Sequence, residues 1–250
     1  DSHPHRAMQA GDDQAMRLKC INIDCVEGMG KLSESSVDCI ITSPPYKDED
    51  GYSDELMIDW LEQAYRIMKT DTSLFLNFGH LARFKSRGFR VAMMAENVGF
   101  TWNDTITWVK NHYRPIQGDK RVNNLTEFIF ILTKGNPSFD RLAIGIQYVD
   151  KSNVGRFSDL DLKCRGNVWH LKYKTVQSKE QKRHNDRFPV DLPLWCLRLV
   201  DLDEGSLVVD PFNGSGTTGI ACKLTGVDYI GYEINPDHVQ NSLDWWRFDS

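Results

Sequence analysis

Short apolar runs alternate with longer amphipathic segments along most of the 250-residue chain, and this alternation is the feature that most limits its fold. The runs 36–42 and 206–210 are almost continuously apolar, which is typical of strands buried on both faces of a sheet. The segment 54–69 instead repeats apolar residues at helical spacing, with Asp54 as its expected N-cap. Strands that alternate with helices predict a mostly parallel sheet with helices on both faces.

The same patterns predict the remaining elements by residue range. Further strands are expected at 18–24, 73–78, 100–110, 125–134 and 228–233. Further helices are expected at 25–32, 81–97, 189–200, 216–226 and 235–246. Residues 135–187 have little periodicity and predict an irregular insertion, whereas the polar residues 1–16 predict a disordered arm or an expression remnant.

Composition and charge narrow the functional classes. The net charge is −5, which argues against a general nucleic-acid-binding protein, but Lys and Arg residues gather at 110–121 and 172–187. Local clusters matter more than the total charge for contacts with phosphate groups. No run approaches the ~18 apolar residues of a membrane span, so no membrane association is expected.

The six cysteines include no CxxC pair, so buried free thiols are expected and a zinc site is not. The N-terminal segment lacks the apolar core of a signal peptide. Both observations predict a cytoplasmic protein.

The segment from Asp210 to Gly219, DPFNGSGTTG, joins a buried strand to a helix. Gly214 and Gly216 allow a tight turn and a close approach of the backbone to a ligand. The start of the helix adds free N–H donors and partial positive charge. Glu233, at the end of the next strand, can accept hydrogen bonds from a ribose diol. This unit therefore predicts a site for a nucleoside-containing cofactor.

The glycines alone leave the identity of that cofactor open. Gly214, Gly216 and Gly219 also fit GxGxxG, the dinucleotide fingerprint. However, only residues 220–250 follow them, too few to complete a dinucleotide fold in the usual order. No Lys follows the second glycine, so the segment is not a P-loop either.

A second unusual loop, Thr42-Ser43-Pro44-Pro45-Tyr46, follows the first buried strand. The prolines fix their φ angles and make the loop rigid before any ligand binds. The carbonyl groups of Ser43 and Pro44 and the Ser43 hydroxyl can accept hydrogen bonds. Tyr46 offers a ring for base stacking, which is worth ~1–3 kcal/mol. These groups suit a planar base that carries an amino group.

The amine nitrogen of such a base is a poor nucleophile because its lone pair is delocalised into the ring. Two acceptors on its N–H bonds could aim the lone pair at a methyl donor, so positioning would supply most of the rate. Both loops follow strands of a mostly parallel sheet. We therefore expect them at the same edge of that sheet.

These two motifs resemble those of a known family. TSPPY resembles the catalytic motif of the amino-DNA methyltransferases, and DPFNGSGTT resembles their cofactor motif. Their order along the chain is similar to that of the β-class, a circular permutation of the methyltransferase fold. The resemblance implies an α/β, class I methyltransferase-like fold with a mostly parallel seven-stranded sheet and S-adenosyl-L-methionine as cofactor. The substrate would be a base flipped out of DNA.

The resemblance also implies roles for particular residues. The catalytic residues would be Ser43, Pro44, Pro45 and Tyr46. The cofactor-binding residues would be Asp24, Phe188, Pro189, Asp210, Phe212, Asn213, Gly214, Gly216, Thr217, Thr218 and Glu233. Residues 17–134 and 188–250 would be the catalytic and cofactor-binding halves of one domain, and 135–187 the target-recognition insertion. Candidate contacts to DNA are Arg114, Arg121, Asn123, Arg156, Lys172 and Lys174.

Relatives of this kind are often dimeric and can accompany a restriction endonuclease, so a homodimer and a cognate endonuclease are expected partners. A bacterial, archaeal or phage genome is the expected source. Ser43, where other members have Asp, resembles the N4-cytosine branch more than the N6-adenine branch, so cytosine N4 is slightly favoured. The alternatives are a methyltransferase acting on RNA or a protein amide, an NAD-dependent oxidoreductase, and a DNA-binding module without catalysis.

Overall fold

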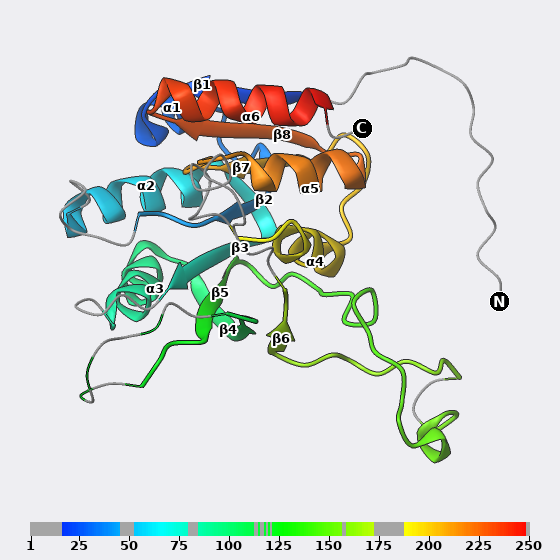
Figure 1. Cartoon of the computed structure of the whole chain (residues 1–250). Coiled ribbons are helices and arrows are strands. Elements are labelled where there is room, and N and C mark those ends of the chain that lie inside the picture. Colours follow the sequence, from blue (N-terminus) through cyan, green and yellow to red (C-terminus); the bar gives the residue numbers. More distant parts are fainter. Residues whose placement is uncertain are drawn as a thin grey trace, which may run out of the picture.

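The computed structural model describes residues 17–45, 53–79, 85–112, 115, 118, 120, 122–156, 159–172 and 188–248. Within them, one sheet of eight strands has the order β1-β8-β7-β2-β3-β5-β4-β6 (Figure 1). The strands are β1 Leu18–Asn22, β2 Val37–Thr42, β3 Met68–Gly79, β4 Thr101–Val109, β5 Thr126–Lys134, β6 Val168–His170, β7 Leu207–Asp210 and β8 Asp228–Glu233. The helices are α1 Cys25–Gly30, α2 Asp54–Ile67, α3 Arg87–Val98, α4 Asp191–Val200, α5 Thr217–Thr225 and α6 Pro236–Phe248.

The sheet is mostly parallel, as the apolar strand patterns predict. Strands β1, β8, β7, β2 and β3 run parallel to one another, whereas β5 is antiparallel to both β3 and β4. Strand β6 adds to the seven expected strands and pairs with β4 in parallel. Its three residues are too few to show a strand periodicity, which is why the sequence pattern missed it.

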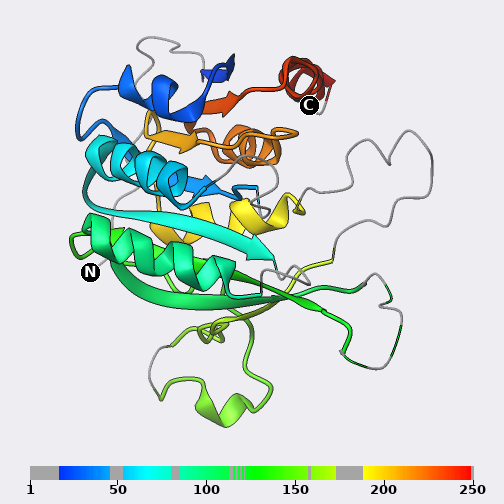
Figure 2. The same cartoon turned by 90° about the vertical axis from the view of Figure 1, so that its left-hand side faces the viewer.

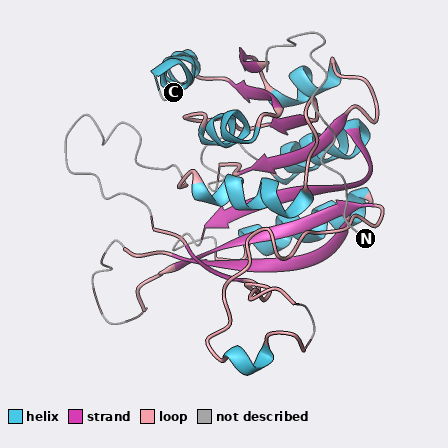
Figure 3. Cartoon of the chain, turned by 90° about the vertical axis from the view of Figure 1, so that its right-hand side faces the viewer, coloured by secondary structure: helices cyan, strands magenta, loops and turns pink. Residues whose placement is uncertain are grey.

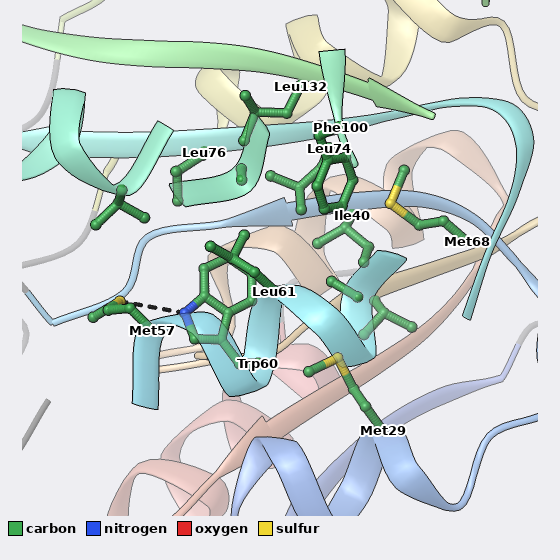
Figure 4. Close-up of a cluster of buried hydrophobic side chains, with 14 of the residues drawn as sticks. Met29, Ile40, Met57, Trp60, Leu61, Met68, Leu74, Leu76, Phe100 and Leu132 are labelled. Carbon is green, nitrogen blue, oxygen red and sulfur yellow. Dashed lines mark hydrogen bonds between the residues drawn. The ribbon is translucent and has the colours of Figure 1, made fainter. Parts of the chain in front are cut away.

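Helices cover both faces of the sheet and enclose two apolar cores. Helices α1, α2 and α3 pack on one face, and α4, α5 and α6 on the other (Figure 2). The alternation along β5 shows how the strands serve both cores, because Phe130 and Leu132 enter the first and Ile129 and Ile131 the second. Figure 4 shows the first core, where the Trp60 indole N–H donates to a neighbouring methionine sulfur.

The start of α2 differs from the sequence prediction. Ser53, not Asp54, is the N-cap, and its Oγ accepts a hydrogen bond from the Leu56 N–H at 3.3 Å. Asp54 is the first helical residue and instead forms ion pairs with Arg87 and Arg90 at the start of α3. A negative side chain is favourable in a first helical turn in either role, so the pattern alone did not separate them.

The described residues between β5 and α4 have little regular structure apart from β6, which lies within the range 135–187 and joins the main sheet. They also contain a short 3₁₀ helix at Lys151–Asn153 and one isolated bridge between Ile146 and Lys163. Around the 3₁₀ helix the chain projects away from the sheet (Figures 2 and 3). Closer to the sheet, the Arg165 guanidinium lies 4.1 Å from the Trp195 ring of α4.

Four of the six cysteines are buried free thiols, Cys164 is exposed and Cys20 is intermediate. In the part of the chain that the structure describes, no helix is long and apolar enough to cross a membrane. The expected arm at 1–16 lies outside the described residues.

Candidate active site at the carboxyl edge of the sheet

The proline loop and the glycine loop leave the sheet side by side. Their strands, β2 and β7, are paired neighbours, although the motifs lie far apart in the sequence. Thr42 Oγ1, at the end of β2, donates a hydrogen bond of 2.7 Å to Asp210 Oδ1, at the end of β7. Figure 3 shows the arrowheads of the central strands on one side of the molecule. The expectation that both loops share one edge is confirmed.

The two glycines of the DPFNGSGTT segment have different surroundings. Both have positive φ angles, +52° at Gly214 and +80° at Gly216, which glycine adopts without strain. A Cβ on Gly216 would lie 2.8 Å from atoms of Ser242, so α6 leaves no room for a side chain there. Among the residues that the structure describes, a Cβ on Gly214 would meet only the Phe212 carbonyl oxygen, 3.9 Å away. Within this part of the chain, Gly214 therefore faces open space that a ligand can enter.

Glu233 holds the glycine loop from the end of β8. Its Oε2 accepts a hydrogen bond of 2.9 Å from the Gly214 N–H, and its Oε1 accepts one of 2.8 Å from the Asn235 N–H. The side chain is 12% exposed. A carboxylate has about four lone-pair sites, so acceptor capacity remains on both oxygens for a hydroxyl pair.

Asp24 stands at the same edge, after β1. It is the N-cap of α1, and its Oδ1 accepts hydrogen bonds from the Val26 and Glu27 N–H groups at 2.9 and 3.3 Å. Since β1 pairs with β8 in parallel as far as Asn22 and Glu233, the acids after β1, β8 and β7 follow one another along the edge.

Several side chains expected at the cofactor point into the protein instead. Asn213 is 4% exposed and bonds Tyr229 and Ser242 through its amide. Phe212 packs edge-to-face on Trp60 of α2, with ring centroids 5.5 Å apart. Thr217 is 4% exposed, and its Oγ1 lies 3.4 Å from Ser215 Oγ. These side chains fix the shape of the loop.

Asp210 is the most deeply enclosed acid of the site. Burial raises the pKa of its carboxyl from 3.8 to about 6, while hydrogen bonds from Thr42, Thr218 and the Phe212 N–H lower it. The negative charge of Glu233 raises it further.

The proline loop positions Ser43 beside a residue that the sequence analysis did not select. Ser43 Oγ donates to Asn77 Oδ1 over 3.3 Å, and Asn77 Nδ2 donates to the Phe128 carbonyl over 3.2 Å. Pro44 is buried and Pro45 is partly exposed, whereas Tyr46 lies outside the described residues. Asn77 is 3% exposed. A polar residue in the otherwise apolar end of this strand was the sequence signal that could have identified it as a site residue.

Of the residues expected to contact DNA, the structure describes Asn123, Arg156 and Lys172, all exposed; Arg114, Arg121 and Lys174 lie outside the described residues. Asn123 precedes β5 and Lys172 follows β6. Because β5 is antiparallel to β3, both lie toward the edge that carries Ser43. Arg156 instead follows the 3₁₀ helix in the projecting insertion.

Phe188 and Pro189 lie at the start of α4. Phe188 packs against the second core, and the Pro189 carbonyl accepts a hydrogen bond of 3.0 Å from the Leu192 N–H. Both are partly exposed.

Solved structures of DNA methyltransferases share this fold. The chain superposes on the PvuII DNA methyltransferase, described as cytosine-N4-specific, with a TM-score of 0.71 and 20% identity, covering 94% of this chain and 87% of that one. It superposes on M1.HpyAVI in complex with SAM with a TM-score of 0.64 and 23% identity, covering 92% of this chain and all of that one. The class defined by fold and site is thus a methyltransferase-type α/β protein.

The family follows from the sequence comparison. A family model described as DNA methylase, N6_N4_Mtase, matches residues 37–244. The type II methyltransferase M.HpaI of Haemophilus parainfluenzae is 28% identical over 249 residues, which cover 94% of this chain and 74% of the relative. The chain belongs to the N6/N4 DNA methylase family.

Proposed function

We propose that this protein transfers a methyl group from S-adenosyl-L-methionine to an exocyclic amine of a DNA base, with cytosine N4 favoured over adenine N6. The observation that carries the proposal is the joint placement of Ser43 and the glycine loop. Ser43 directly follows Thr42, which is hydrogen-bonded to Asp210 at the base of that loop.

The residues of the glycine loop fit this cofactor. Gly214 leaves open space where a side chain would otherwise stand, and Glu233 keeps acceptor capacity for the two ribose hydroxyls beside it. Asp24 stands at the neighbouring strand end, where it can face the adenine ring. When bound, S-adenosylmethionine supplies a methyl group on a positively charged sulfur.

Ser43 would orient the amine that receives this methyl group. Its hydroxyl has one proton and two lone pairs. While that proton is directed to Asn77 Oδ1, the hydroxyl oxygen can accept a hydrogen bond from the amine. The Phe128 carbonyl fixes the Asn77 amide with its oxygen toward Ser43. Transfer of the methyl group would leave the cofactor sulfur neutral, and the methylated amine would release one proton to water.

The neutral character of this pair favours cytosine N4. Both Ser43 and Asn77 are uncharged, so the described groups beside the amine act as hydrogen-bonding partners and not as a charged base. Positioning against a reactive methyl donor supplies most of the rate in such a site. The likeness of fold to a cytosine-N4-specific enzyme agrees with this assignment.

DNA would approach the edge where Asn123 and Lys172 are exposed, and the target base would leave the stack to reach Ser43. We assign the remaining contacts to the basic segments 110–121 and 172–187. A homodimer and a cognate restriction endonuclease are expected from the family resemblance alone and stay predictions.

The test is direct analysis of the product. The protein is incubated with S-adenosylmethionine carrying a labelled methyl group and with duplex DNA, RNA or protein, and digested products are separated by mass spectrometry. We expect N4-methylcytosine from DNA. N6-methyladenine would transfer the assignment to the adenine branch, and label only in RNA or protein would overturn it.

A further inference from the structure

Two hydroxyl groups from distant parts of the chain meet on one buried carboxylate. Thr42 Oγ1 donates to Asp210 Oδ1 over 2.7 Å, and Thr218 Oγ1, in the first turn of α5, donates to Asp210 Oδ2 over 2.8 Å. The Phe212 N–H adds a bond of 3.0 Å to Oδ1. Both threonines are 0% exposed and Asp210 is 2% exposed, so water does not compete for these bonds.

The place of this bridge matters because backbone pairing ends just before it. The ladder between β2 and β7 ends with the pair of Ile40 and Val209, whereas β2 stays paired with β3 as far as Thr42. Beyond that pair, the hydrogen bond from Thr42 to the Asp210 carboxylate joins β2 to β7 in place of backbone pairing. Thr42 is the last residue of β2 before the chain enters the proline loop. The same carboxylate holds the first turn of α5 through Thr218.

We propose that Thr42, Asp210 and Thr218 form a positioning bridge that sets the separation between the proline loop and the glycine loop. The proposal rests on the proposed function, in which these loops hold the target amine and the cofactor. Asp210 then acts through its neighbours, because both of its oxygens accept hydrogen bonds from protein groups. It follows that a change at Thr42, in the proline loop, also alters cofactor binding.

The bridge requires an ionised carboxylate, because all three partners donate hydrogen bonds to it. Protonation removes the negative charge and makes one oxygen a donor, so the three bonds that the carboxylate accepts are weakened. With the pKa of Asp210 at about 6, this weakening falls at mildly acidic pH. Removing either threonine hydroxyl removes a group that lowers this pKa, so the acid limb of activity should move to higher pH.

The thiols and the phenol around Asp210 keep one state over that range. Burial raises the pKa of the Cys20 and Cys25 thiols to about 12, and those of Cys222 on α5 and Tyr229 on β8 well above their ordinary values. These groups remain neutral between pH 5 and 8. Glu233 on β8 raises the pKa of Asp210 through its negative charge.

The test compares threonine variants that lose or keep the hydroxyl. Thr42→Val and Thr218→Val each remove one donor, and Thr42→Ser and Thr218→Ser keep it. Thr72→Val is the matched control, since Thr72 Oγ1 donates a bond of equal length, 2.7 Å, to the Lys69 carbonyl near the opposite end of β3. Methyl transfer to duplex DNA gives kcat from pH 5 to 8, and calorimetric titration with S-adenosylmethionine gives the Kd over the same range.

We expect Thr42→Val to lower kcat about tenfold, the loss typical of one hydrogen bond to a charged group. It should also weaken S-adenosylmethionine binding and move the acid limb upward. The serine variants should keep the wild-type position of the acid limb, because they keep the hydroxyl donor, and Thr72→Val should stay near the wild-type protein. The double valine variant should lose little more than the worse single variant, because both changes break one bridge.

An unchanged Kd and acid limb in Thr42→Val, or fully additive losses in the double variant, would overturn the bridge. Thermal unfolding is measured for every variant. If Thr218→Val does not fold, the pH dependence of Thr42→Val by itself supports or overturns the bridge. Failure of the wild-type protein to methylate DNA would contradict the proposed function instead. The cofactor titrations need no turnover and would still judge the bridge.

Discussion

At the scale of single residues, Asn77 determines the direction in which the Ser43 hydroxyl donates its hydrogen bond. A hydroxyl can donate or accept, and the Asn77 carbonyl oxygen, 3.3 Å away, selects donation in that direction. Asn77 is itself oriented by the Phe128 carbonyl. One buried amide thus directs the Ser43 proton, as the proposed role of the Ser43 oxygen as an acceptor for a base requires.

We predict that Asn77→Leu lowers kcat for DNA methylation by about tenfold, because the Ser43 hydroxyl loses the acceptor that orients it. The Kd for S-adenosylmethionine should change little, since Asn77 acts on Ser43 and is held by the Phe128 carbonyl of β5. Steady-state kinetics and calorimetric titration measure the two effects. Asn103→Leu, at an exposed position of β4, is the control. A variant that loses cofactor affinity and turnover together would contradict this role.

The two loop glycines should respond differently to the same substitution. Gly216→Ala drives a Cβ to 2.8 Å from Ser242, so it should lower the melting temperature strongly. Gly214→Ala has room for the methyl group and carries only the cost of a left-handed backbone, ~1–2 kcal/mol. Its main effect should be weaker S-adenosylmethionine binding at a largely retained melting temperature. Equal thermal losses in the two variants would count against open space at Gly214.

At the scale of elements, α6 stabilises the glycine loop from outside. The Trp246 indole N–H donates to the Gly216 carbonyl over 2.8 Å, and Ser242 Oγ donates to the Gly214 carbonyl over 3.2 Å. Trp246 also fills the space beside Gly219, where a Cβ would lie 2.4 Å from its ring. The final helix therefore shapes the loop although it carries no motif residue.

We predict that Trp246→Phe lowers the free energy of unfolding by roughly 1–3 kcal/mol. The Gly216 carbonyl loses the indole donor and keeps only the Ile220 N–H, and the smaller ring leaves part of the indole's space empty. Cofactor affinity should fall in the same variant. Denaturant unfolding and titration with S-adenosylmethionine measure the two effects. Trp245→Phe, the neighbouring and less buried tryptophan, is the control. Full cofactor affinity in Trp246→Phe would show that α6 does not shape the loop.

The sequence predicted the elements well where their patterns were long. Apart from β6, the described strands and helices overlap the expected ranges, because apolar runs and helical spacing are local signals, although β3 begins at Met68 and not at 73. The common edge of the two loops followed from the parallel sheet, whereas the pairing of β2 with β7 was not predicted. The side-chain contacts of the site could not be predicted from the sequence. Asn77 contacts Ser43, and Ser242 contacts Asn213, only in the assembled sheet. Strand β6 was too short to show a period.

At the scale of the whole molecule, the site carries a cost in stability. The carboxyl edge brings Asp24, Asp210 and Glu233 to three neighbouring strand ends, and Asp210 is only 2% exposed. Burying an ionised carboxylate is unfavourable even when it is hydrogen-bonded, which is the physical cause of its raised pKa. The apolar side chains buried on both faces of the sheet stabilise the fold enough to offset this unfavourable term.

That cost predicts a pH dependence with a definite sign. The pKa of Asp210 is about 6 in the folded protein against 3.8 for an ordinary carboxyl, so between these values the folded state binds more protons. Its contribution to stability is therefore fully present below pH 3.8 and is lost as the pH rises through about 6. The shift corresponds to about 3 kcal/mol.

Asp210→Asn removes the titrating group and should remove this slope. Urea unfolding of both proteins at pH 4, 6 and 8 measures it: the wild-type protein should lose up to about 3 kcal/mol relative to Asp210→Asn as the pH rises. Carboxyl groups far from Asp210 titrate equally in both proteins and cancel in the difference. The variant should be less active at pH 8 despite equal or greater relative stability there, because one amide oxygen cannot accept all three hydrogen bonds. Parallel pH curves for the two proteins would mean that Asp210 titrates as it does in water, and the enclosed bridge between the loops would then be wrong as well.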